Sequence, residues 1–561
     1  RAGRPVRSGG QLLADQLELH GVELAFCVPG ESYLALLDGL YTHRERLRVV
    51  TCRHEAAAAN AADAYGKLTG RPGICMVTRG PGATHASTGV HTAMQDSTPM
   101  ILLVGQVPRE HRGREAFQEV DYEQMFGRLA KWVFEIDRPE RIPELVARAF
   151  ETALSGRPGP VVLALPEDVL SALTDVPDGV PAPRAASAPA AQALARMREL
   201  LAAAERPLAI VGGGGWTRAG AQDIAAYLSA SGIPAAASFR CQDVVDNDLP
   251  VYCGDLGLGV NPALARRVRE ADLVLAVGTR LSEIETGGYA YLTPPVPSQT
   301  LVHVHQDATE LGRVYRPELG IVSGLPEFAA AARASEPLDP RRYEAWRSAA
   351  RADYEHALSF DPAPGNGVDL AAVLTHLRAR LPDAIVANGA GNYTVWVHRF
   401  WQFSSYRSQL APLSGAMGYG VQAAVAAKLV HPERPVVAFA GDGCFLMCAQ
   451  ELATMVANEL DVLVIVVNNG MLGTIRMHQE RHYPGRVMAT DLVNPDFAAF
   501  AQSFGAYGER VEETGAFGAA LERALAAGGP ALLELVCDPE ALTPRQSLSQ
   551  ARAQGERSTA S

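Results

Sequence analysis

Short, continuous apolar runs alternate along this chain with longer, alanine-rich amphipathic stretches, and this alternation restricts the fold more than any other feature. Examples of the apolar runs are residues 22–28, 73–80, 100–107 and 160–166. Strands that are buried on both faces are apolar throughout, whereas strands with one face in water alternate apolar and polar residues. The sequence therefore predicts the α/β class, with doubly wound parallel sheets that helices cover on both faces.

Two interruptions divide this pattern. Residues 177–192 are rich in proline and alanine and have no periodicity, which indicates a linker, and residues 336–366 are polar with a helical piece in the middle. The final residues, 546–561, are polar and small, which predicts a frayed tail. Each remaining piece has the usual size of a domain, so we expect three domains, at 8–176, 193–335 and 367–540.

Charge and composition exclude several classes of protein. The net charge of −12 argues against nucleic acid or an acidic membrane surface as the main partner. The first ten residues contain no apolar signal region, and no stretch approaches the roughly 18 apolar residues of a membrane span. The eight cysteines lie scattered in apolar runs, and only Cys444 and Cys448 are close in sequence. We therefore expect a cytoplasmic protein with reduced core cysteines.

Residues 435–470 contain the motif that is most informative about function. A buried strand ends at Gly-Asp-Gly (441–443), a helix follows, and a second buried strand ends at Asn-Asn-Gly (468–470). An Asp-Gly turn and an Asn-Gly hairpin turn would each account for one of these tripeptides. Neither turn explains why both tripeptides end buried strands on either side of one helix. The segment is better interpreted as a βαβ unit, whose parallel strands end at the same edge of the sheet.

That edge would carry oxygen ligands. Asp442 supplies a carboxylate, Asn469 supplies an amide oxygen, and a backbone carbonyl lies two residues beyond Asn469. Mg²⁺ and Ca²⁺ prefer such ligands and leave positions for phosphate oxygens. Gly441 and Gly443 would let the backbone approach a phosphate closely. The sequence therefore predicts a site for a divalent cation and a phosphorylated cofactor.

This motif resembles the thiamine-diphosphate motif of the pyruvate decarboxylase and acetolactate synthase superfamily, because 24 residues separate the Gly-Asp-Gly from the Asn-Asn. The resemblance implies thiamine diphosphate and Mg²⁺ as cofactors. It implies Asp442, Asn469 and the backbone carbonyl of Met471 as the metal ligands. Cys444 follows the motif directly and would lie beside the cofactor.

The segment RHEAAAANAADAYG resembles the family's catalytic-glutamate segment, in which Glu55 is the glutamate. A glutamate in the first turn of a helix most often only complements the helix dipole, but the metal motif in the same chain favours the catalytic interpretation. In this family, a carboxyl group bonded to the pyrimidine ring promotes the imino tautomer that takes the proton from C2 of the thiazolium ring.

The resemblance covers nearly the whole chain and implies further site residues. Phe117 and Gln118, in the segment 114–121, would face the reacting carbons from the partner subunit. In the segment 413–420, the Gly415 carbonyl would hold the 4′-amino group, and Met417 would separate the two rings of the cofactor. The other positions implied in the cofactor site are Thr78, Gly389, Gly391, Ala416, Gly441 and Gly443.

The segment 193–335 resembles the non-catalytic middle domain of acetolactate synthases. Its four glycines, 212–215, do not complete a dinucleotide fingerprint, because the last position of G-x-G-x-x-G would be Thr217 or Arg218. We therefore do not expect NAD. Related synthases often hold FAD here without a redox role, and both alternatives, FAD or no flavin, stay open.

Three positions depart from the usual acetolactate synthase pattern. Glu167 stands where the family has lysine, Ile284 where it has arginine, and Gly473-Thr474 where it has Gly-Met. The first two changes remove cations from the region that handles flavin and the carboxylate of the second substrate. Alternatively, Arg280, Arg476 or His478 supplies the charge.

Two further comparisons concern histidines. The His-His pair of pyruvate decarboxylases is absent from residues 110–113, which makes that activity the less attractive one. His85 stands where synthases usually have asparagine. It is either a titrating group near the pyrimidine side or a core histidine.

The resemblance implies a carboligase of the acetolactate synthase type, a transferase. It would decarboxylate a 2-oxo acid such as pyruvate and transfer the acyl-anion equivalent to a second carbonyl compound. The alternatives are a decarboxylase or lyase with a neutral acceptor, and a non-catalytic homologue that only binds the cofactor. Family members build the site from the first domain of one chain and the third of another, so we expect a homodimer or homotetramer.

Overall fold

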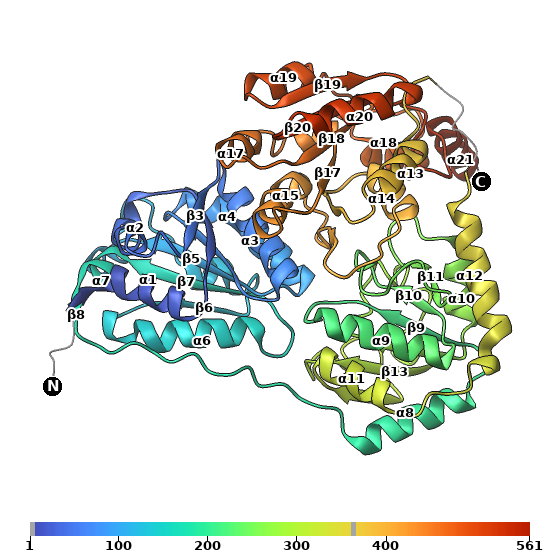
Figure 1. The fold of residues 1–561 in the computed structure, drawn as a ribbon, viewed down its shortest axis with the longest axis horizontal. Helices are drawn as coiled ribbons and strands as arrows, with labels where there is room; N and C mark the ends of the chain where they lie inside the picture. The colour runs from blue at the N-terminus through green and yellow to red at the C-terminus, as the bar shows by residue number, and fades with distance from the viewer. Residues whose placement is uncertain (1–5, 361–365, 561) are drawn as a thin grey trace. The chain divides into compact units, whose positions relative to one another are not determined.

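The computed structural model describes residues 6–360 and 366–560 (Figure 1). The chain forms two compact units. One contains the chain up to Ala185 together with Val425–Val430, and the other contains Ala186–Ala424 and the chain from His431 onward. Three six-stranded sheets, one in the first unit and two in the second, are parallel throughout. The predicted α/β class with three doubly wound parallel sheets is confirmed.

The sheet of the first unit has the strand order β3-β2-β4-β5-β7-β6. Its inner strands consist of fully buried residues, because helices cover both faces. The strands are β2 (Leu24–Cys27), β3 (Arg48–Thr51), β4 (Gly73–Val77), β5 (Met100–Gln106), β6 (Trp132–Glu135) and β7 (Pro160–Pro166). The helices are α1 (Gly9–Leu19), α2 (Leu34–Tyr41), α3 (Glu55–Thr69), α4 (Pro81–Asp96), α5 (Tyr122–Phe126), α6 (Ile142–Leu154) and α7 (Glu167–Ser171).

The two units divide between Ala185 and Ala186, within a segment that has neither helix nor strand and that leads to Ala191. Its first sheet has the order β11-β10-β9-β12-β13-β14. The strands are β9 (Pro207–Val211), β10 (Ala235–Ala237), β11 (Tyr252–Asp255), β12 (Leu273–Val277), β13 (Thr300–His305) and β14 (Leu319–Val322). The helices are α8 (Ala191–Ala203), α9 (Arg218–Ser231), α10 (Pro262–Glu270), α11 (Leu325–Ala334) and α12 (Glu344–Leu358).

The last sheet has the order β16-β15-β17-β18-β20-β19. The chain builds outward in opposite directions from β15 and β17, and open parallel sheets bind ligands at such a switch point, outside the carboxyl ends of the strands. The strands are β15 (Ile385–Asn388), β16 (Gln409–Leu410), β17 (Val436–Gly441), β18 (Leu463–Asn468), β19 (Tyr507–Val511) and β20 (Ala531–Val536). The helices are α13 (Leu370–Arg380), α14 (Tyr393–Phe400), α15 (Tyr419–Val430), α16 (Asp442–Phe445), α17 (Glu451–Ala457), α18 (Gly473–His482), α19 (Phe497–Ser503), α20 (Phe517–Ala526) and α21 (Leu548–Ala560).

Buried polar contacts join the two sheets of the second unit. The Asp243 carboxylate accepts hydrogen bonds from the backbone N–H groups of Arg407 (2.9 Å) and Ser408 (3.0 Å). The Gln242 backbone N–H donates to the side-chain oxygen of Gln409 at 2.7 Å. Burial raises the pKa of Asp243, and the backbone donors oppose this increase. These contacts fix the segment before β16 against the preceding sheet.

Two predictions of local structure were wrong. The single helix expected between the Gly-Asp-Gly and Asn-Asn tripeptides is interrupted, and forms the short α16 and then α17. The frayed tail expected at 546–561 is instead the helix α21, packed against α18. Leu548, Ala551 and Gly555 recur on one face of α21 and are buried, which supplies the apolar stripe that a packed helix needs. In the described ranges, no helix combines the length and apolar character needed to cross a membrane.

Candidate active site

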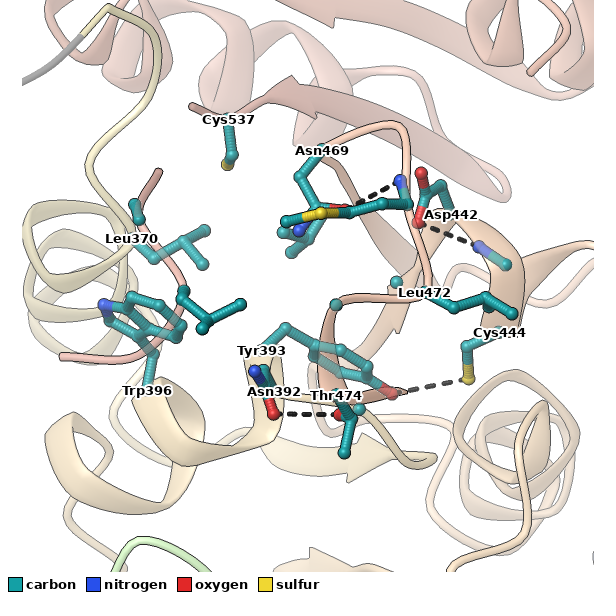
Figure 2. A pocket seen from close by; sticks show the side chains of 18 of the residues that line it. Leu370, Asn392, Tyr393, Trp396, Asp442, Cys444, Asn469, Leu472, Thr474 and Cys537 are labelled. Carbon is teal, nitrogen blue, oxygen red and sulfur yellow. Dashed lines mark hydrogen bonds between the residues drawn. The ribbon is translucent and has the colours of Figure 1, made fainter. Parts of the chain in front are cut away.

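The carboxyl ends of β17 and β18 bring Asp442 and Asn469 to one edge of the last sheet (Figure 2). Asp442 begins α16 and is only 3% exposed. One carboxylate oxygen accepts the backbone N–H of Gly443 at 2.9 Å, and the other accepts the backbone N–H of Gly470 at 2.9 Å. Desolvation by burial raises the pKa of Asp442, although these donors favour the charged form. A bound cation would offset the cost of this buried negative charge.

Asn469 and Met471 supply the other predicted ligand atoms. The amide oxygen of Asn469 accepts the backbone N–H of Met471 at 3.3 Å, and both residues line the same cavity as Asp442. Within the described residues, no N–H group donates to the backbone carbonyl of Met471. A carboxylate, an amide oxygen and a carbonyl without a donor form the hard-oxygen set that Mg²⁺ accepts. The residues present therefore fit a divalent cation.

Asn494 also belongs to this edge, and sequence reasoning missed it. Its Nδ2 donates to Asp442 at 2.8 Å and to the side-chain oxygen of Asn468 at 3.0 Å, so it orients the carboxylate. Its own side-chain oxygen is buried without a hydrogen-bond partner in the described part of the chain. No spacing signal marks Asn494, because it lies in a loop 52 residues beyond Asp442.

The cavity extends from this edge to the switch point between β15 and β17 (Figure 2). Tyr393 lines the cavity. Its hydroxyl accepts the backbone N–H of Gly389 at 2.9 Å and lies 3.5 Å from the sulfur of Cys444. The same sulfur accepts the backbone N–H of Gly418 at 3.0 Å. Besides Asp442, Asn469 and Met471, the predicted cofactor residues that line the cavity are Gly391, Met417, Gly441, Gly443 and Cys444.

Glycines keep the backbone around this cavity open. A side chain at Gly443 would place its Cβ 2.7 Å from a methyl group of Leu472, and Gly391 has a φ of +141°. Gly415 also has a positive φ, +69°, in an exposed turn beside the half-buried Ala416. The backbone around the cavity is therefore free of side chains where a diphosphate would approach.

In the first unit, Glu55 begins α3, as predicted from the sequence. Its Oε2 lies 2.8 Å from Nδ1 of His85, and the Glu55 side chain is 13% exposed. The rings of His54 and His85 stack with centroids 4.5 Å apart. Burial, followed by the neighbouring His85, lowers the pKa of His54. Glu55 is therefore held in a fixed position beside two imidazoles, and the 50% exposure of the His85 side chain does not fit a core histidine.

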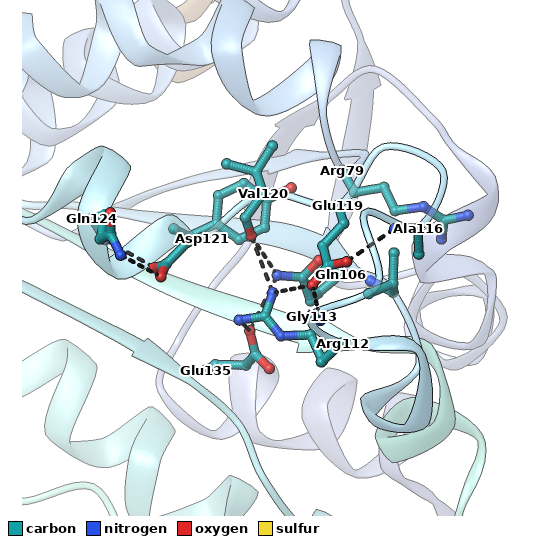
Figure 3. A network of polar contacts seen from close by, with 12 residues as sticks. Arg79, Gln106, Arg112, Gly113, Ala116, Glu119, Val120, Asp121, Gln124 and Glu135 are labelled. Carbon is teal, nitrogen blue, oxygen red and sulfur yellow. Dashed lines mark hydrogen bonds and ion pairs between the residues drawn. The ribbon is translucent and has the colours of Figure 1, made fainter.

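Phe117 and Gln118 lie on a loop that a polar network holds in place (Figure 3). The Glu119 carboxylate accepts the backbone N–H groups of Gly113 (2.7 Å) and Ala116 (3.0 Å), and these contacts lower its pKa. Gln118 has a φ of +64° and packs against Gly80. Phe117 is 77% exposed. The backbone of the loop is therefore fixed, and the Phe117 ring projects from it into solvent.

Arg79 and Thr78 follow β4 beside this loop. The Thr78 hydroxyl lies 2.9 Å from that of Ser32, and Nε of Arg79 donates to the carbonyl of Phe117 at 3.2 Å. The Arg79 guanidinium also forms an ion pair with Glu167. Glu167, which stands where a lysine was expected, therefore neutralises a neighbouring arginine.

Comparison with known proteins decides the family. Residues 7–125, 194–332 and 389–535 match the N-terminal TPP binding domain, the central domain and the C-terminal TPP binding domain of the thiamine pyrophosphate enzymes. The chain belongs to the thiamine pyrophosphate enzyme family. It is a thiamine-diphosphate-dependent enzyme.

Curated relatives in this family are similar over nearly their whole length. The probable acetolactate synthase large subunit of Methanocaldococcus jannaschii is 32% identical over 96% of this chain and 93% of its own. The acetolactate synthase isozyme 2 large subunit of Escherichia coli is 32% identical over 95% of this chain and 96% of its own. The acetolactate synthase large subunit of Corynebacterium glutamicum is 32% identical over 91% of this chain and 84% of its own.

Two charged residues near the remaining departures have local partners in this thiamine pyrophosphate enzyme. Glu285, next to Ile284, is buried and accepts hydrogen bonds from the Thr279 hydroxyl (2.7 Å) and the Ser282 backbone (2.5 Å). Arg476 pairs with Glu480 at 3.0 Å and with Asp491 at 3.1 Å, so its charge is already compensated.

Packing accounts for the glycine run 212–215 of this family member. A Cβ at Gly213 would lie 2.0 Å from the carbonyl oxygen of Gly278, and a Cβ at Gly212 would lie 2.4 Å from the Cβ of Ser238. Glycines are therefore required at both positions whether or not a flavin binds.

Proposed function

We propose that this enzyme is a carboligase of the acetolactate synthase type. It decarboxylates a 2-oxo acid, with pyruvate as the first candidate, and joins the resulting acyl-anion equivalent to a second carbonyl compound. The observation that carries the proposal is the metal edge, where Asp442, Asn469 and the Met471 carbonyl meet in one cavity. The names of the full-length relatives support the reaction class.

In this proposal, thiamine diphosphate supplies the electron sink for decarboxylation when it is bound. Asp442, Asn469 and the Met471 carbonyl hold Mg²⁺ against the diphosphate. When the cofactor is bound, Met417 would lie between its two rings, and the Gly415 carbonyl would hold its amino group. Glu55 would bond to the pyrimidine ring and hold the proton whose movement activates the cofactor, while His85 fixes the Glu55 carboxylate.

The cavity also favours the chemistry by its apolar lining. Val467, Leu472 and Leu542 face it together with Trp396. Loss of CO₂ disperses the charge of the donor carboxylate, and a site that excludes water favours such a step. The bond between C1 and C2 of the donor breaks, its electron pair forms the new bond to the acceptor carbon, and the acceptor oxygen takes up one proton.

A second candidate function is carboligation onto an aldehyde. The ion pair between Arg79 and Glu167 favours it, because the position where a lysine was expected now carries a carboxylate. A lost charged hydrogen bond weakens binding by roughly 1.5–3 kcal/mol, or about tenfold to a hundredfold. A second 2-oxo acid should therefore bind more weakly than a neutral acceptor.

Product analysis tests both functions. Purified enzyme with thiamine diphosphate and Mg²⁺ is given pyruvate alone, and then pyruvate with an equal concentration of a small aldehyde. Acetolactate as the dominant product identifies a synthase, and a mixed 2-hydroxy ketone identifies the aldehyde function. Free aldehyde from the donor, without any carbon–carbon bond formation, would identify a simple decarboxylase and reject the carboligase proposal.

A further inference from the structure

A second cavity, of about 760 Å³, adjoins the cofactor cavity in the second unit and is lined by arginines. Gly391, Asn392 and Thr474 line both cavities, so they form a common wall. The arginines come from three separate parts of the fold: Arg399 from α14, Arg481 from α18, and Arg545 and Arg557 from the C-terminal segment that contains α21. Among the described residues, no aspartate or glutamate lines this cavity. We call it the arginine basin.

The hydrogen-bond acceptors of these arginines are neutral. Arg399 donates to the backbone carbonyl of Ala357 at 2.5 Å and Arg545 to that of Val260 at 2.6 Å. Nε of Arg481 donates to the side-chain oxygen of Gln546 at 3.1 Å. In the described part of the chain, none of the basin arginines forms an ion pair.

Neighbouring arginines behave differently. Arg476 on α18 and Arg552 on α21 both pair with the buried carboxylate of Glu480, at 3.0 and 2.7 Å. Glu480 thus compensates the arginines that hold these two helices together. In the described ranges, Arg481 and Arg557, which line the basin, have no carboxylate partner. On these two helices the arginines that hold the packing share a carboxylate partner, so Arg481 and Arg557 fit a ligand better than a packing role.

The electrostatics of the basin agree with this geometry. Burial lowers the pKa values of Arg399, Arg481 and Arg545, and the neighbouring Arg545 lowers that of Arg399 further. The charge of Asp255 acts on Arg545, but burial raises the pKa of Asp255 to about 7, so it compensates Arg545 only in part at neutral pH. A bound anion would relieve this excess of positive charge.

We propose that the arginine basin binds the phosphoryl group of the acceptor, which is an aldehyde with a phosphate ester at the end remote from its carbonyl. A carboxylate occupies one guanidinium fork, whereas a phosphoryl group offers three charged oxygens and can engage several arginines at once. The carbonyl end would reach the common wall, where the Thr474 hydroxyl donates to Asn392 at 2.8 Å.

This assignment rests on the proposed carboligase function, since it names the acceptor class of the same site. The donor loses CO₂, the electron pair of its broken carbon–carbon bond joins the aldehyde carbon, and the aldehyde oxygen takes one proton. The phosphate ester stays intact. The aldehyde carbon carries no carboxylate, which agrees with the neutralised Arg79.

The experiment compares glyceraldehyde 3-phosphate with glyceraldehyde as acceptors for pyruvate, using the holoenzyme. We expect the unmodified enzyme to favour the phosphorylated acceptor in kcat/KM. Arg557→Gln and Arg481→Gln should each lower this preference about tenfold to a hundredfold, the range for a lost charged hydrogen bond. Arg380→Gln is the matched control, because Arg380 pairs with Glu522 outside the basin and its loss should leave the preference unchanged.

A second measurement separates the basin from the proposed function. Calorimetry follows binding of inorganic phosphate to the holoenzyme and to the same variants. If no acceptor is joined to pyruvate but the basin variants weaken phosphate binding, the carboligase proposal fails and the anion site stands alone. Equal use of both acceptors by the unmodified enzyme overturns the phosphorylated-acceptor assignment. Phosphate binding that Arg557→Gln and Arg481→Gln both leave unchanged overturns the site.

Discussion

The Asp442 carboxylate is oriented by Asn494, whose amide group also donates to Asn468. This bridge ties the two strand ends together, so the carboxylate faces the cavity before any cation binds. Outer groups of this kind commonly change metal affinity by about 10- to 100-fold when they are removed. The geometry of the metal edge therefore depends on Asn494 as well as on the predicted metal ligands.

We predict that Asn494→Ala weakens Mg²⁺-dependent binding of thiamine diphosphate by about 10- to 100-fold, and that Asp442→Ala abolishes saturable binding. Quenching of tryptophan fluorescence measures this, because Trp396 lines the cavity. Asn458→Ala is the control, since its side chain donates to the Thr454 carbonyl at 2.8 Å, at the end of α17. An Asp442→Ala variant with the affinity of the unmodified enzyme would refute the metal assignment.

Glu55 is held beside His85 by a 2.8 Å contact, and we predict that it relays the proton that activates the cofactor. Glu55→Gln should slow hydrogen–deuterium exchange at C2 of bound thiamine diphosphate by about 10²- to 10⁴-fold, because an amide cannot relay a proton. NMR of the quenched cofactor measures the rate. His85→Asn, which introduces the residue usual in synthases, should retain most of the exchange. Exchange at the original rate in Glu55→Gln would remove Glu55 from the mechanism.

At the scale of elements, helix α21 closes one side of the arginine basin and is fixed to α18 through Glu480. The Glu480 carboxylate bonds to Arg552 at 2.7 and 2.9 Å and to Arg476 at 3.0 Å. These contacts, with Arg552 first, lower the pKa of Glu480 to about 2. Because the pKa of Glu480 is depressed in the folded protein, its ionised carboxylate stabilises the packing of α21 on α18 fully above about pH 4.5. This stabilisation is lost as the pH falls towards 2.

We predict that Arg552→Ala loosens α21. The Arg552 side chain is 43% exposed, so the stabilisation lost with its ion pair to Glu480 should lie between that of a surface pair and that of a buried pair. Amide hydrogen exchange over residues 548–558 should then accelerate at least about tenfold. Arg557→Ala removes the same charge from the same helix without breaking an ion pair, and should leave the exchange rate unchanged. Equal acceleration in both variants would mean that Glu480 does not fix the helix.

Most of the sheet strands were predictable, because their residues are buried on both faces and leave long apolar runs in the sequence. The packed α21 was not, since Leu548, Ala551 and Gly555 are small or isolated and a polar sequence surrounds them. The break between α16 and α17 was also missed, because the residues between them have good helix propensity and only tertiary packing interrupts them. Asn494 was missed because only tertiary packing brings its loop to the site, and no sequence motif marks it.

At the scale of the whole molecule, the two groups with the clearest expected roles lie in different compact units. Glu55 belongs to the first unit and Asp442 to the second. The family resemblance implies a site built from the first domain of one chain and the third of another, so we predict a twofold assembly in which each site takes Glu55 from one copy and Asp442 from its partner. A site within one chain would use both residues of the same copy, and mixed oligomers distinguish the two arrangements.

We predict that two inactive variants restore activity to one another. When Glu55→Gln and Asp442→Ala chains are unfolded together and refolded in equal amounts, about half of the dimers contain one chain of each kind. Each such dimer has one site with both substitutions and one site with neither. The mixture should therefore recover about a quarter of the activity of the unmodified enzyme, measured as CO₂ release from pyruvate. Each variant refolded alone is the control and should remain inactive. If the mixture also remains inactive while size-exclusion chromatography shows mixed dimers, both residues act within one chain. The predicted sharing of each site between two subunits is then wrong.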